Sequence, residues 1–247
     1  MIIEKKLGIP PDYQEKALNG SNFIQSNWHA NKLYVVNKLI NITGKERVLD
    51  LGTGSGNFEL AFANHVAEIV GIDYNSDAVK YLQEKLRNHN ISNVKLINED
   101  IRNLENVLDR SNKFDLIVIL DVIEHLDYKD ANILVHTLNN YLNKNGLVLV
   151  ITPNYKSPWP LIECFLDTFK IVPTLASMQH LTKFDRENLT SLFKKHRFRT
   201  ITLKTFNLFS FVFPLASKRL CKLELVSSIN LGNLIVGVFG MKKTKVS

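Results

Sequence analysis

Residues 47–56 read Arg-Val-Leu-Asp-Leu-Gly-Thr-Gly-Ser-Gly, and this stretch decides the fold. The apolar residues before Gly52 have the pattern of a buried strand, and alternating glycines follow at once. Apolar residues from Phe58 to Phe62 then recur near helical spacing, so we predict a strand, a glycine turn and a helix over 56–66. Glycine tolerates positive φ and places no Cβ between backbone and ligand. A ligand can therefore lie directly on this turn, near the partial positive charge of the helix N-terminus.

Strands and helices alternate along the chain after this turn. Apolar runs predict strands over 47–51, 68–73, 94–98, 115–120, 146–152, 198–204 and 234–240. Periodic apolar residues predict helices over 76–89 and 128–143, and Asp185 is a predicted N-cap, with Asn188 at the third helical position, of a helix that ends near His196. The alternation is typical of a parallel, doubly wound α/β sheet.

The spacing of the glycines separates this turn from the dinucleotide fingerprint G-x-G-x-x-G. The third glycine of that fingerprint would fall at Asn57. Instead the glycines alternate, and Asp50 stands two residues before the first of them. This D-x-G-x-G-x-G form resembles motif I of the class I S-adenosylmethionine (SAM) methyltransferases.

The resemblance extends from about residue 45 to residue 155 and continues loosely beyond. Asp73 ends the second strand, as the ribose-binding acid of that family does, and Asn98-Glu99-Asp100-Ile101 is similar to its adenine-binding segment. Residues 114–118 and 145–154 resemble its fourth and fifth strands. Asp121-Val122-Ile123-Glu124-His125-Leu126 resembles the E-V-I-E-H-V stretch of the ubiquinone-biosynthesis O-methyltransferase group, with Asp for the first Glu.

The resemblance implies a doubly wound, Rossmann-like sheet of seven strands, mostly parallel with the last strand antiparallel. It also implies one methyltransferase domain over 1–247. Its expected parts are an N-terminal arm and covering helix (1–44), a SAM-binding core (45–154), a substrate cover (155–182) and a C-terminal part (183–247) with an insertion at 205–233.

The implied cofactor is SAM, with S-adenosylhomocysteine (SAH) as the product. The implied binding residues are Asp50, Gly52, Thr53, Gly54, Gly56, Asp73, Tyr74, Asp100, Ile101 and Leu120. Asp73 would accept from the ribose hydroxyls, or else cap the next helix. Asp100 would accept from the adenine amine, or else serve only as a turn residue. Asp50 would orient the turn or accept from the methionyl ammonium, and the carbonyl of Leu120 would accept from that ammonium.

Methyl transfer is an in-line displacement, so much of the acceleration comes from alignment and desolvation. An alcohol or phenol acceptor must also lose its proton, which favours a general base. The candidates are His125, which follows the fourth strand, and His180, in a His-x-x-x-Phe segment similar to one in the resembled group. A structural role for His125 is the alternative. A divalent metal held by Asp121, Glu124 and His125, as the resembled group suggests, is a further alternative, and our primary prediction contains no metal.

The acceptor is constrained by a missing motif. Family members that methylate exocyclic amines or glutamine amides usually carry N-P-P-Y after the fourth strand, where this chain has Leu120-Asp121-Val122-Ile123. O-methylation of a small-molecule or lipid-like acceptor is therefore favoured by resemblance. A methyltransferase of nucleic acid or protein, and a non-catalytic SAM-binding protein, are the alternatives.

Composition limits the partners and the compartment. The chain has 247 residues, a net charge of +7 and a pI of about 9.3, which permits an anionic partner. Its basic clusters, at 194–197 and 218–219, are short, so nucleic acid is not favoured. Cys164 and Cys221 lack a metal-binding spacing and fit a reducing cytoplasm. No apolar run approaches the length of a membrane span, so we expect a cytoplasmic protein with peripheral membrane contact as an open alternative.

Two segments outside the core have their own patterns. Residues 1–20 are predicted to be an irregular arm, and 21–41 an amphipathic helix whose Trp28 and His29 either cover the ligand or have only structural roles. The insertion at 205–233 is more apolar than a connecting loop should be. Within it, Pro214 can open a helix. One apolar face of that helix would hold Leu215, Ala216, Leu220, Leu223 and Val226, and Lys218 and Lys222 would lie beside this face. Arg219 falls close to that face and weakens a membrane role. We predict that this insertion borders the acceptor pocket, and its packing in a homodimer is the alternative.

Overall fold

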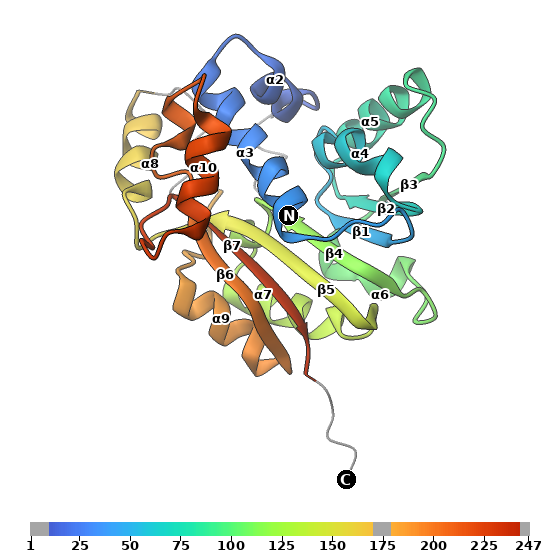
Figure 1. Ribbon diagram of the computed structural model, residues 1–247. Helices are drawn as coiled ribbons and strands as arrows, with labels where there is room; N and C mark the ends of the chain where they lie inside the picture. Colours follow the sequence, from blue (N-terminus) through green and yellow to red (C-terminus); the bar gives the residue numbers. More distant parts are fainter. Residues whose placement is uncertain (1–9, 170–178, 243–247) are drawn as a thin grey trace.

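The computed structural model describes residues 10–169 and 179–242, and it contains one seven-stranded sheet of order β3-β2-β1-β4-β5-β7-β6 (Figure 1). The strands are β1 (Arg47–Leu51), β2 (Glu68–Asp73), β3 (Val94–Asn98), β4 (Phe114–Leu120), β5 (Leu142–Pro153), β6 (Phe198–Phe206) and β7 (Leu234–Met241). The β7 strand runs antiparallel to both β5 and β6, and the first five strands pair in parallel. The predicted fold class, with its antiparallel last strand, is confirmed.

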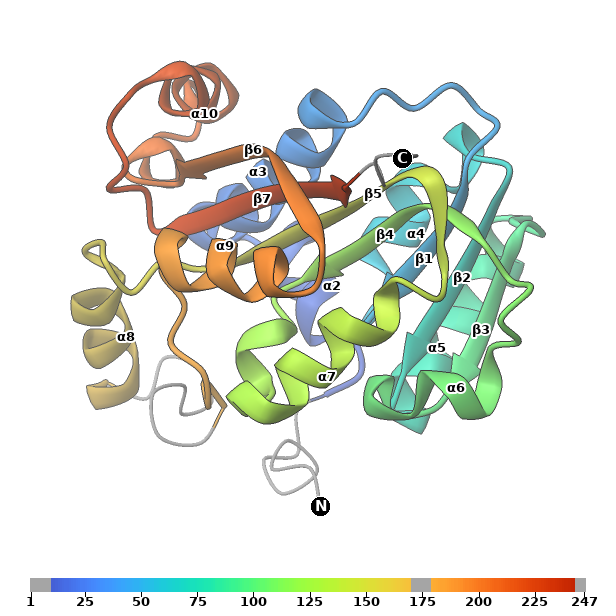
Figure 2. The same cartoon turned by 90° about the horizontal axis from the view of Figure 1, so that it is seen from below.

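Helices cover both faces of this sheet (Figure 2). They are α2 (Tyr13–Asn19), α3 (Phe23–Leu39), α4 (Asn57–Phe62), α5 (Ser76–Asn88), α6 (Leu104–Val107), α7 (Tyr128–Leu138), α8 (Trp159–Thr168), α9 (Arg186–Lys195) and α10 (Ser217–Val226). The α3, α4 and α10 helices pack on one face through residues such as Val36, Phe62 and Leu225. The α6, α7 and α9 helices pack on the other through residues such as Leu134 and Leu192. Short 3-10 turns are η1 (Ala63–His65), η2 (Ile101–Asn103), η3 (Ile123–His125) and η4 (Ser210–Val212).

Short polar side chains fix where several helices begin. Asn22, Asn75, Asp127 and Asp185 cap α3, α5, α7 and α9, and each accepts from a backbone N–H of the first turn. The Asn188 side chain accepts in turn from the backbone N–H of Asp185, which completes a capping box. The predicted N-cap at Asp185 is therefore confirmed.

Some of the predicted elements were wrong in part. The helix predicted after Pro214 begins at Ser217, and its buried face holds Cys221 and Leu225 and not the predicted apolar residues, of which Leu215 and Ala216 precede the helix. The arm over 1–20 is not irregular throughout, because its residues 13–19 form α2. The helix predicted over 128–143 ends at Leu138, and β5 already begins at Leu142. The reason is that the backbone N–H of Phe114 donates to the carbonyl of Tyr141 at 2.8 Å, so the chain there has joined the sheet. Within the predicted cover, α8 is a helical piece as expected, and residues 170–178 lie outside the described part.

The glycine turn between β1 and α4 uses the left-handed region of backbone space. Gly52, Gly54 and Gly56 have φ of 86°, 50° and 84°. A Cβ on Gly54 would lie 2.4 Å from the side-chain oxygen of Gln14, and one on Gly56 would lie 2.1 Å from Leu82. These glycines therefore serve both the turn and the close approach of α2 and α5.

Gly56→Ala tests this packing against a matched control. Alanine at positive φ costs about 1–2 kcal/mol, and overpacking against Leu82 adds about 1–3 kcal/mol. Gly44 also has positive φ, 90°, but a Cβ there would meet nothing within 4 Å. We expect Gly56→Ala to lower the free energy of unfolding, measured by urea denaturation, by about 2–5 kcal/mol, and Gly44→Ala by about 1–2 kcal/mol. Equal losses would mean that Leu82 moves aside without cost.

Candidate functional site

A cavity of about 470 Å³ opens at the carboxyl ends of β1, β2 and β4. Ligands of open α/β sheets bind at this end. The predicted site residues that line it are Gly52, Gly54, Asp73, Tyr74, Asp100, Ile101, His125 and His180. The remaining predicted residues, Asp50, Thr53, Gly56 and Leu120, are not among the lining residues. All four lie close in the chain to residues that line the cavity. Asp50 belongs to β1, Thr53 and Gly56 belong to the glycine turn after it, and Leu120 is the last residue of β4.

Asp73 holds the glycine turn in place. It is only 6% exposed, and its carboxylate accepts from the backbone N–H of Gly54 at 2.8 Å and of Asn75 at 2.8 Å. Gly52 N–H donates to the carbonyl of Ile72 at 2.7 Å, which ties the same turn to β2. Each carboxylate oxygen can accept more than one hydrogen bond. Asp73 can therefore hold the turn and still accept from a ligand in the cavity.

A pair of buried acids lies behind the turn. Asp50 is 3% exposed, and Glu59, on α4, is fully buried. Burial, together with the charge of Asp73, raises the pKa of Asp50 to about 7, and burial and the charge of Asp50 raise the pKa of Glu59 well above its usual value. Like-charged carboxyls in one buried site cannot both ionise cheaply. The pair therefore holds a proton near neutral pH and adds less negative charge to the turn than two ionised acids would.

Asp100 and Ile101 stand at the end of β3. The Asp100 carboxylate accepts from Arg102 through the backbone N–H at 3.0 Å and through the guanidinium at 2.6 Å. Burial opposes ionisation of Asp100, but the hydrogen bonds and charge of Arg102 hold its pKa below the usual range. The carboxylate is thus an ionised acceptor at the edge of the cavity. Its alternative role as a turn residue is also present, since it caps η2.

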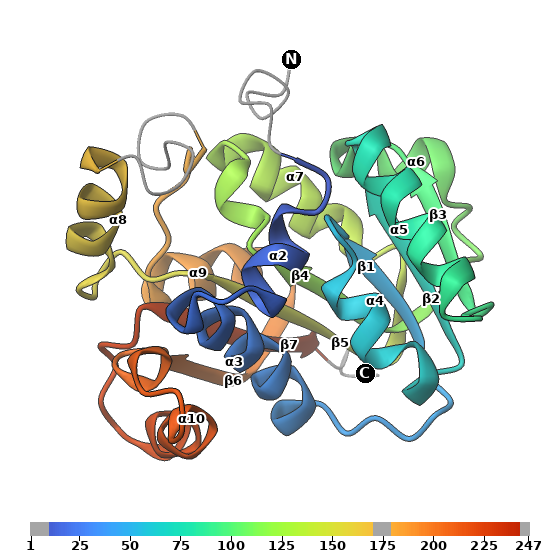
Figure 3. The same ribbon diagram turned by 90° about the horizontal axis from the view of Figure 1, so that it is seen from above.

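The α2 helix covers the glycine turn (Figure 3). The backbone N–H of Gln14 donates to Ser55 Oγ at 3.2 Å, and that hydroxyl donates to the carbonyl of Pro11 at 2.7 Å. The side-chain amide of Asn57 donates to the carbonyl of Gln14 at 3.0 Å. Pro11 and Gln14 also line the cavity. The arm before the covering helix is therefore part of the site.

A partly buried ion pair joins α3 to the end of β4. Lys32 donates to the Asp121 carboxylate, and both residues line the cavity. Burial opposes ionisation of Asp121, but the adjacent Lys32 ammonium holds its pKa below the usual range. Burial and the charge of Lys32 lower the pKa of His29, on the same helix, to about 3, so His29 is neutral. His29 lines the cavity and is no general base at neutral pH.

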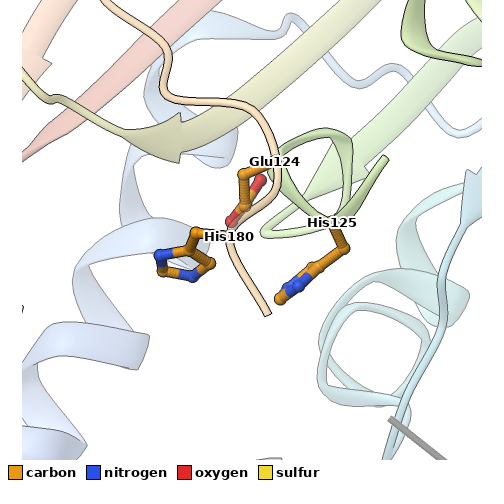
Figure 4. Close-up of side chains that lie close together, drawn as sticks. All are labelled: Glu124, His125 and His180. Carbon is orange, nitrogen blue, oxygen red and sulfur yellow. The ribbon is translucent and has the colours of Figure 1, made fainter. Parts of the chain in front are cut away.

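Glu124, His125 and His180 converge on one space (Figure 4). One ligand atom from each lies within 4.8 Å of the other two. Every member is also held from behind: Glu124 accepts from Thr152 Oγ1 at 2.9 Å, and His125 Nδ1 lies 3.0 Å from the carbonyl of Gln179. A carbonyl only accepts, so His125 Nδ1 carries a proton and donates to it. The structure thus brings the two predicted histidines together and adds Glu124 to them.

Glu163, on α8, fixes the orientation of His180. Its Oε1 lies 2.6 Å from His180 Nδ1 and accepts from the Tyr155 hydroxyl at 2.6 Å. Burial alone lowers the pKa of His180, but the hydrogen bond to Glu163 and the nearby carboxylates raise it above its usual value. Burial and the hydrogen bond to the same acid raise the pKa of Tyr155, so its hydroxyl stays protonated.

These three side chains fit a divalent cation better than Asp121, Glu124 and His125, the set considered as an alternative to a site without metal. Asp121 is paired with Lys32, whereas Glu124 Oε1 is buried and has no hydrogen-bond partner among the described residues. Two imidazoles and a carboxylate, each oriented by a second partner, are a common set for a transition metal. Glu124, His125 and His180 would hold such an ion, and the ion would acidify a hydroxyl bound beside them.

Another part of the cavity wall is apolar. Its large side chains are Ile24, Trp28, Trp159, Ile162, Leu166 and Phe211. The Trp28 ring lies 5.3 Å from that of Trp159 and 5.0 Å from that of Phe211, between centroids. Trp28 therefore both packs and lines the cavity, and Phe211 brings the 205–233 insertion to the cavity as predicted.

Residues 42–201 match the model of the methyltransferase domain family. The chain belongs to this family. Together with the sheet order, this confirms a class I SAM-dependent methyltransferase, whose methyl donor is SAM.

Curated relatives differ in what they methylate. The ubiquinone biosynthesis O-methyltransferase of Glaesserella parasuis is 30% identical over 123 residues, which cover 49% of this chain and 50% of that protein. A 23S rRNA (uracil(1939)-C(5))-methyltransferase of Legionella pneumophila is 25% identical over 163 residues, which cover 57% of this chain and 36% of that protein. The chain spans half the length or less of these relatives.

Solved structures share the fold. The N-methyltransferase NodS from Bradyrhizobium japonicum, in complex with SAH, has a TM-score of 0.60 at 12% identity, over 98% of this chain and 97% of that one. The magnesium protoporphyrin IX methyltransferase from Synechocystis, with bound SAH, has a TM-score of 0.63 at 14% identity, over 93% of each chain. At these identities the likeness supports the fold alone.

Sequence reasoning missed Lys32, Glu59, Tyr155 and Glu163. Glu59 and Glu163 had a detectable signal in the sequence, because each is an acid among apolar residues. Both are buried in the structure. Lys32 and Tyr155 gave none, since their partners, Asp121 and the Glu163–His180 pair, come from other elements.

Asp73→Asn tests the assigned ribose acid. The charged acceptor is lost while the size is kept, and one hydrogen bond to a charged group contributes about 1.5–3 kcal/mol. We expect SAM affinity, measured by calorimetry, to fall about tenfold or more. Asp115→Asn is the matched control, because Asp115 lies near the start of β4 and bonds to Arg47 N–H and to Asn143. Equal affinity in both variants would remove Asp73 from the site.

Zinc titration tests the candidate cation site. We expect Zn²⁺ binding by calorimetry in the intact protein and at least about tenfold weaker binding in His180→Ala. His136→Ala is the control, because His136 and His196 form another histidine pair with ring centroids 5.3 Å apart. Binding that falls only in His136→Ala would assign the ion to that pair and leave the cavity without a metal role.

Proposed function

We propose that this methyltransferase transfers the methyl group of SAM to an oxygen of a small, apolar or lipid-like acceptor. The observation that carries the proposal is one cavity with three kinds of wall: the glycine turn with Asp73, the Glu124–His125–His180 cluster, and the aromatic and aliphatic side chains around Trp28. Its volume of about 470 Å³ is within the usual range for small-molecule sites. An apolar wall favours an apolar acceptor, because its burial releases water from both surfaces.

SAM would lie on the glycine turn. Asp73 would accept from its ribose, Asp100 from its adenine amine with Ile101 beside it, and the carbonyl of Leu120 from its ammonium. Tyr74 would line the ribose and adenine side, since it follows Asp73 and faces the cavity. Asp50, Thr53 and Gly56 do not line the cavity, and they would contribute by setting the shape of the glycine turn.

The polar cluster would hold the acceptor hydroxyl in line with the methyl group. Without a cation, the Nε2 lone pair of His180 or His125 takes the proton, and Glu163 stabilises the charge that forms on His180. If a cation binds, the same side chains would hold it, and it would lower the pKa of a hydroxyl bound beside them. Activity assayed with and without EDTA separates these two cases.

Labelled methyl groups test the acceptor class. The protein is incubated with methyl-labelled SAM and, separately, with a bacterial lipid extract, total RNA and a protein extract. We expect label in an organic-soluble product that resists mild alkali, as an ether does and a methyl ester does not. Label in RNA or protein alone would overturn the proposal. SAM binding with no transfer to any extract would leave a non-catalytic SAM-binding protein.

His180→Ala tests the polar cluster in the same assay. Loss of a positioned base lowers turnover by about 100-fold or more, while SAM affinity stays within the error of calorimetry. Glu163→Gln should cause a smaller loss, because it keeps an acceptor near His180 Nδ1. His196→Ala, a histidine outside the cavity, is the control. Normal turnover in His180→Ala and also in His125→Ala would leave catalysis to alignment alone.

Nucleic acid is the second candidate acceptor, favoured by the rRNA-methylating relatives and the net charge of +7. Binding through phosphates weakens steeply with salt, since each contact releases counterions. A log–log plot of RNA affinity against salt with a slope near zero would exclude an extended phosphate-binding surface.

A further inference from the structure

The segment between β6 and β7, residues 207–233, keeps large apolar side chains in solvent. Leu215 is fully exposed, Val226 is 70% exposed and Phe209 is 62% exposed. The whole set is Phe209, Val212, Phe213, Leu215, Leu223, Val226, Ile229 and Leu231. This is far more than the scattered apolar residues that a soluble surface normally carries.

The segment is nevertheless fixed to its own domain. Cys221 and Leu225, on the inner side of α10, are buried against the sheet. Ser217 Oγ donates to Asn31 Oδ1 at 3.1 Å, and the Asn31 amide donates to Asn207 Oδ1 at 2.8 Å. The inner side of the segment is thus already packed against the domain, so its outer apolar side chains remain on the surface.

The exposed charges of the segment have one sign. Lys218, Arg219 and Lys222 are exposed on α10. The only acid between residues 207 and 233 is Glu224, and it is used internally. Its carboxylate accepts from the backbone N–H of Phe209 at 2.9 Å and from both the N–H and the hydroxyl of Ser210. The outer surface of the segment is therefore apolar and basic, which complements an anionic surface.

The α8 helix lies at the same end of the sheet as α10, and Figures 2 and 3 show the two helices separated from each other at that end. Leu161 and Phe165 are 76% and 54% exposed on its outer side. Its Ile162 and Leu166 line the cavity, as Phe211 does from the 207–233 segment. The two segments with exposed apolar surfaces therefore also supply walls of the acceptor cavity.

We propose that α8 and residues 207–233 form a docking surface for an anionic lipid bilayer, from which a lipid acceptor enters the cavity beside Phe211. The inference deepens the proposed function and rests on it for the route of the acceptor. The proposed contact is peripheral. Among the described residues, no helix is long and apolar enough to cross a membrane. Apolar side chains enter the interface while Lys218, Arg219 and Lys222 meet lipid phosphates. A second copy of the chain fits less well, because a symmetric contact would bring these cations together.

Vesicle sedimentation tests the docking surface without methyl transfer. We expect the protein to bind vesicles of phosphatidylcholine with phosphatidylglycerol, and to bind pure phosphatidylcholine vesicles at least about tenfold more weakly. Phe213→Asp/Leu215→Asp should lose binding about tenfold or more, since both side chains are exposed and their loss leaves the fold intact. Lys218→Glu/Lys222→Glu should lose binding to the anionic vesicles by a similar factor and show a weaker dependence on salt.

The controls are matched in exposure and chemistry. Ile133, on α7, is 48% exposed, and Lys129 on the same helix is also exposed. We expect Ile133→Asp and Lys129→Glu to bind vesicles as the intact protein does, and all variants to keep their SAM affinity. Equal binding by the intact protein and the 213/215 variant would overturn the inference, as would no binding to anionic vesicles. Light scattering that shows a dimer lost in that variant would instead assign the surface to a second copy. Vesicle binding without transfer to any lipid would overturn the proposed acceptor and leave the docking surface.

Discussion

The site depends on the carboxylate of Asp73, which joins the ends of two strands. It receives the backbone N–H of Gly54 from the turn after β1 and that of Asn75 after β2. The backbone N–H of Gly52 also joins the turn to β2, because it donates to the carbonyl of Ile72. A glycine turn is costly to order, because glycine loses more conformational freedom than other residues. The buried acid offsets this cost and leaves the turn in the one shape on which a ligand can rest.

The other walls of the cavity come from segments far apart in the chain. The α2 and α3 helices supply the cover, α8 supplies Trp159 and Ile162, and the segment after β6 supplies Phe211. Hydrogen bonds join them to the sheet: Thr182 N–H donates to the carbonyl of Glu124 at 3.0 Å, and Thr182 Oγ1 donates to that of Leu126 at 2.7 Å. His180, two residues earlier, is thereby held against η3. The reactive cluster is thus a product of tertiary structure and not of one motif.

This difference explains how much the sequence could predict. The strands, the glycine turn and the position of Asp73 follow from local patterns, because apolar periodicity and backbone sterics act over a few residues. The ends of the long elements do not, as at Leu138, where sheet pairing at Tyr141 overrides a continuing helical pattern. The two histidines were found singly, but their meeting with Glu124 and Glu163 depends on how α8 packs. Lys32 was missed for the same reason, since its partner Asp121 belongs to another element.

Most buried charges around the cavity are compensated within the protein, and one buried oxygen at the cavity is left for a ligand. Near the glycine turn, Asp73 is compensated by backbone N–H groups, while Asp50 and Glu59 reduce their charge by holding a proton. Across the cavity, Lys32 neutralises Asp121 within a fixed pair. Among the described acids that line the cavity, only Glu124 has a buried oxygen with no hydrogen-bond partner, whereas Glu59, behind the turn, has two such oxygens. An uncompensated buried oxygen is expensive, and the Glu124 oxygen, unlike those of Glu59, lies where a ligand in the cavity can complete it. That oxygen lies beside both histidines and next to the apolar wall, which is where a polar group on an otherwise apolar acceptor would come to rest.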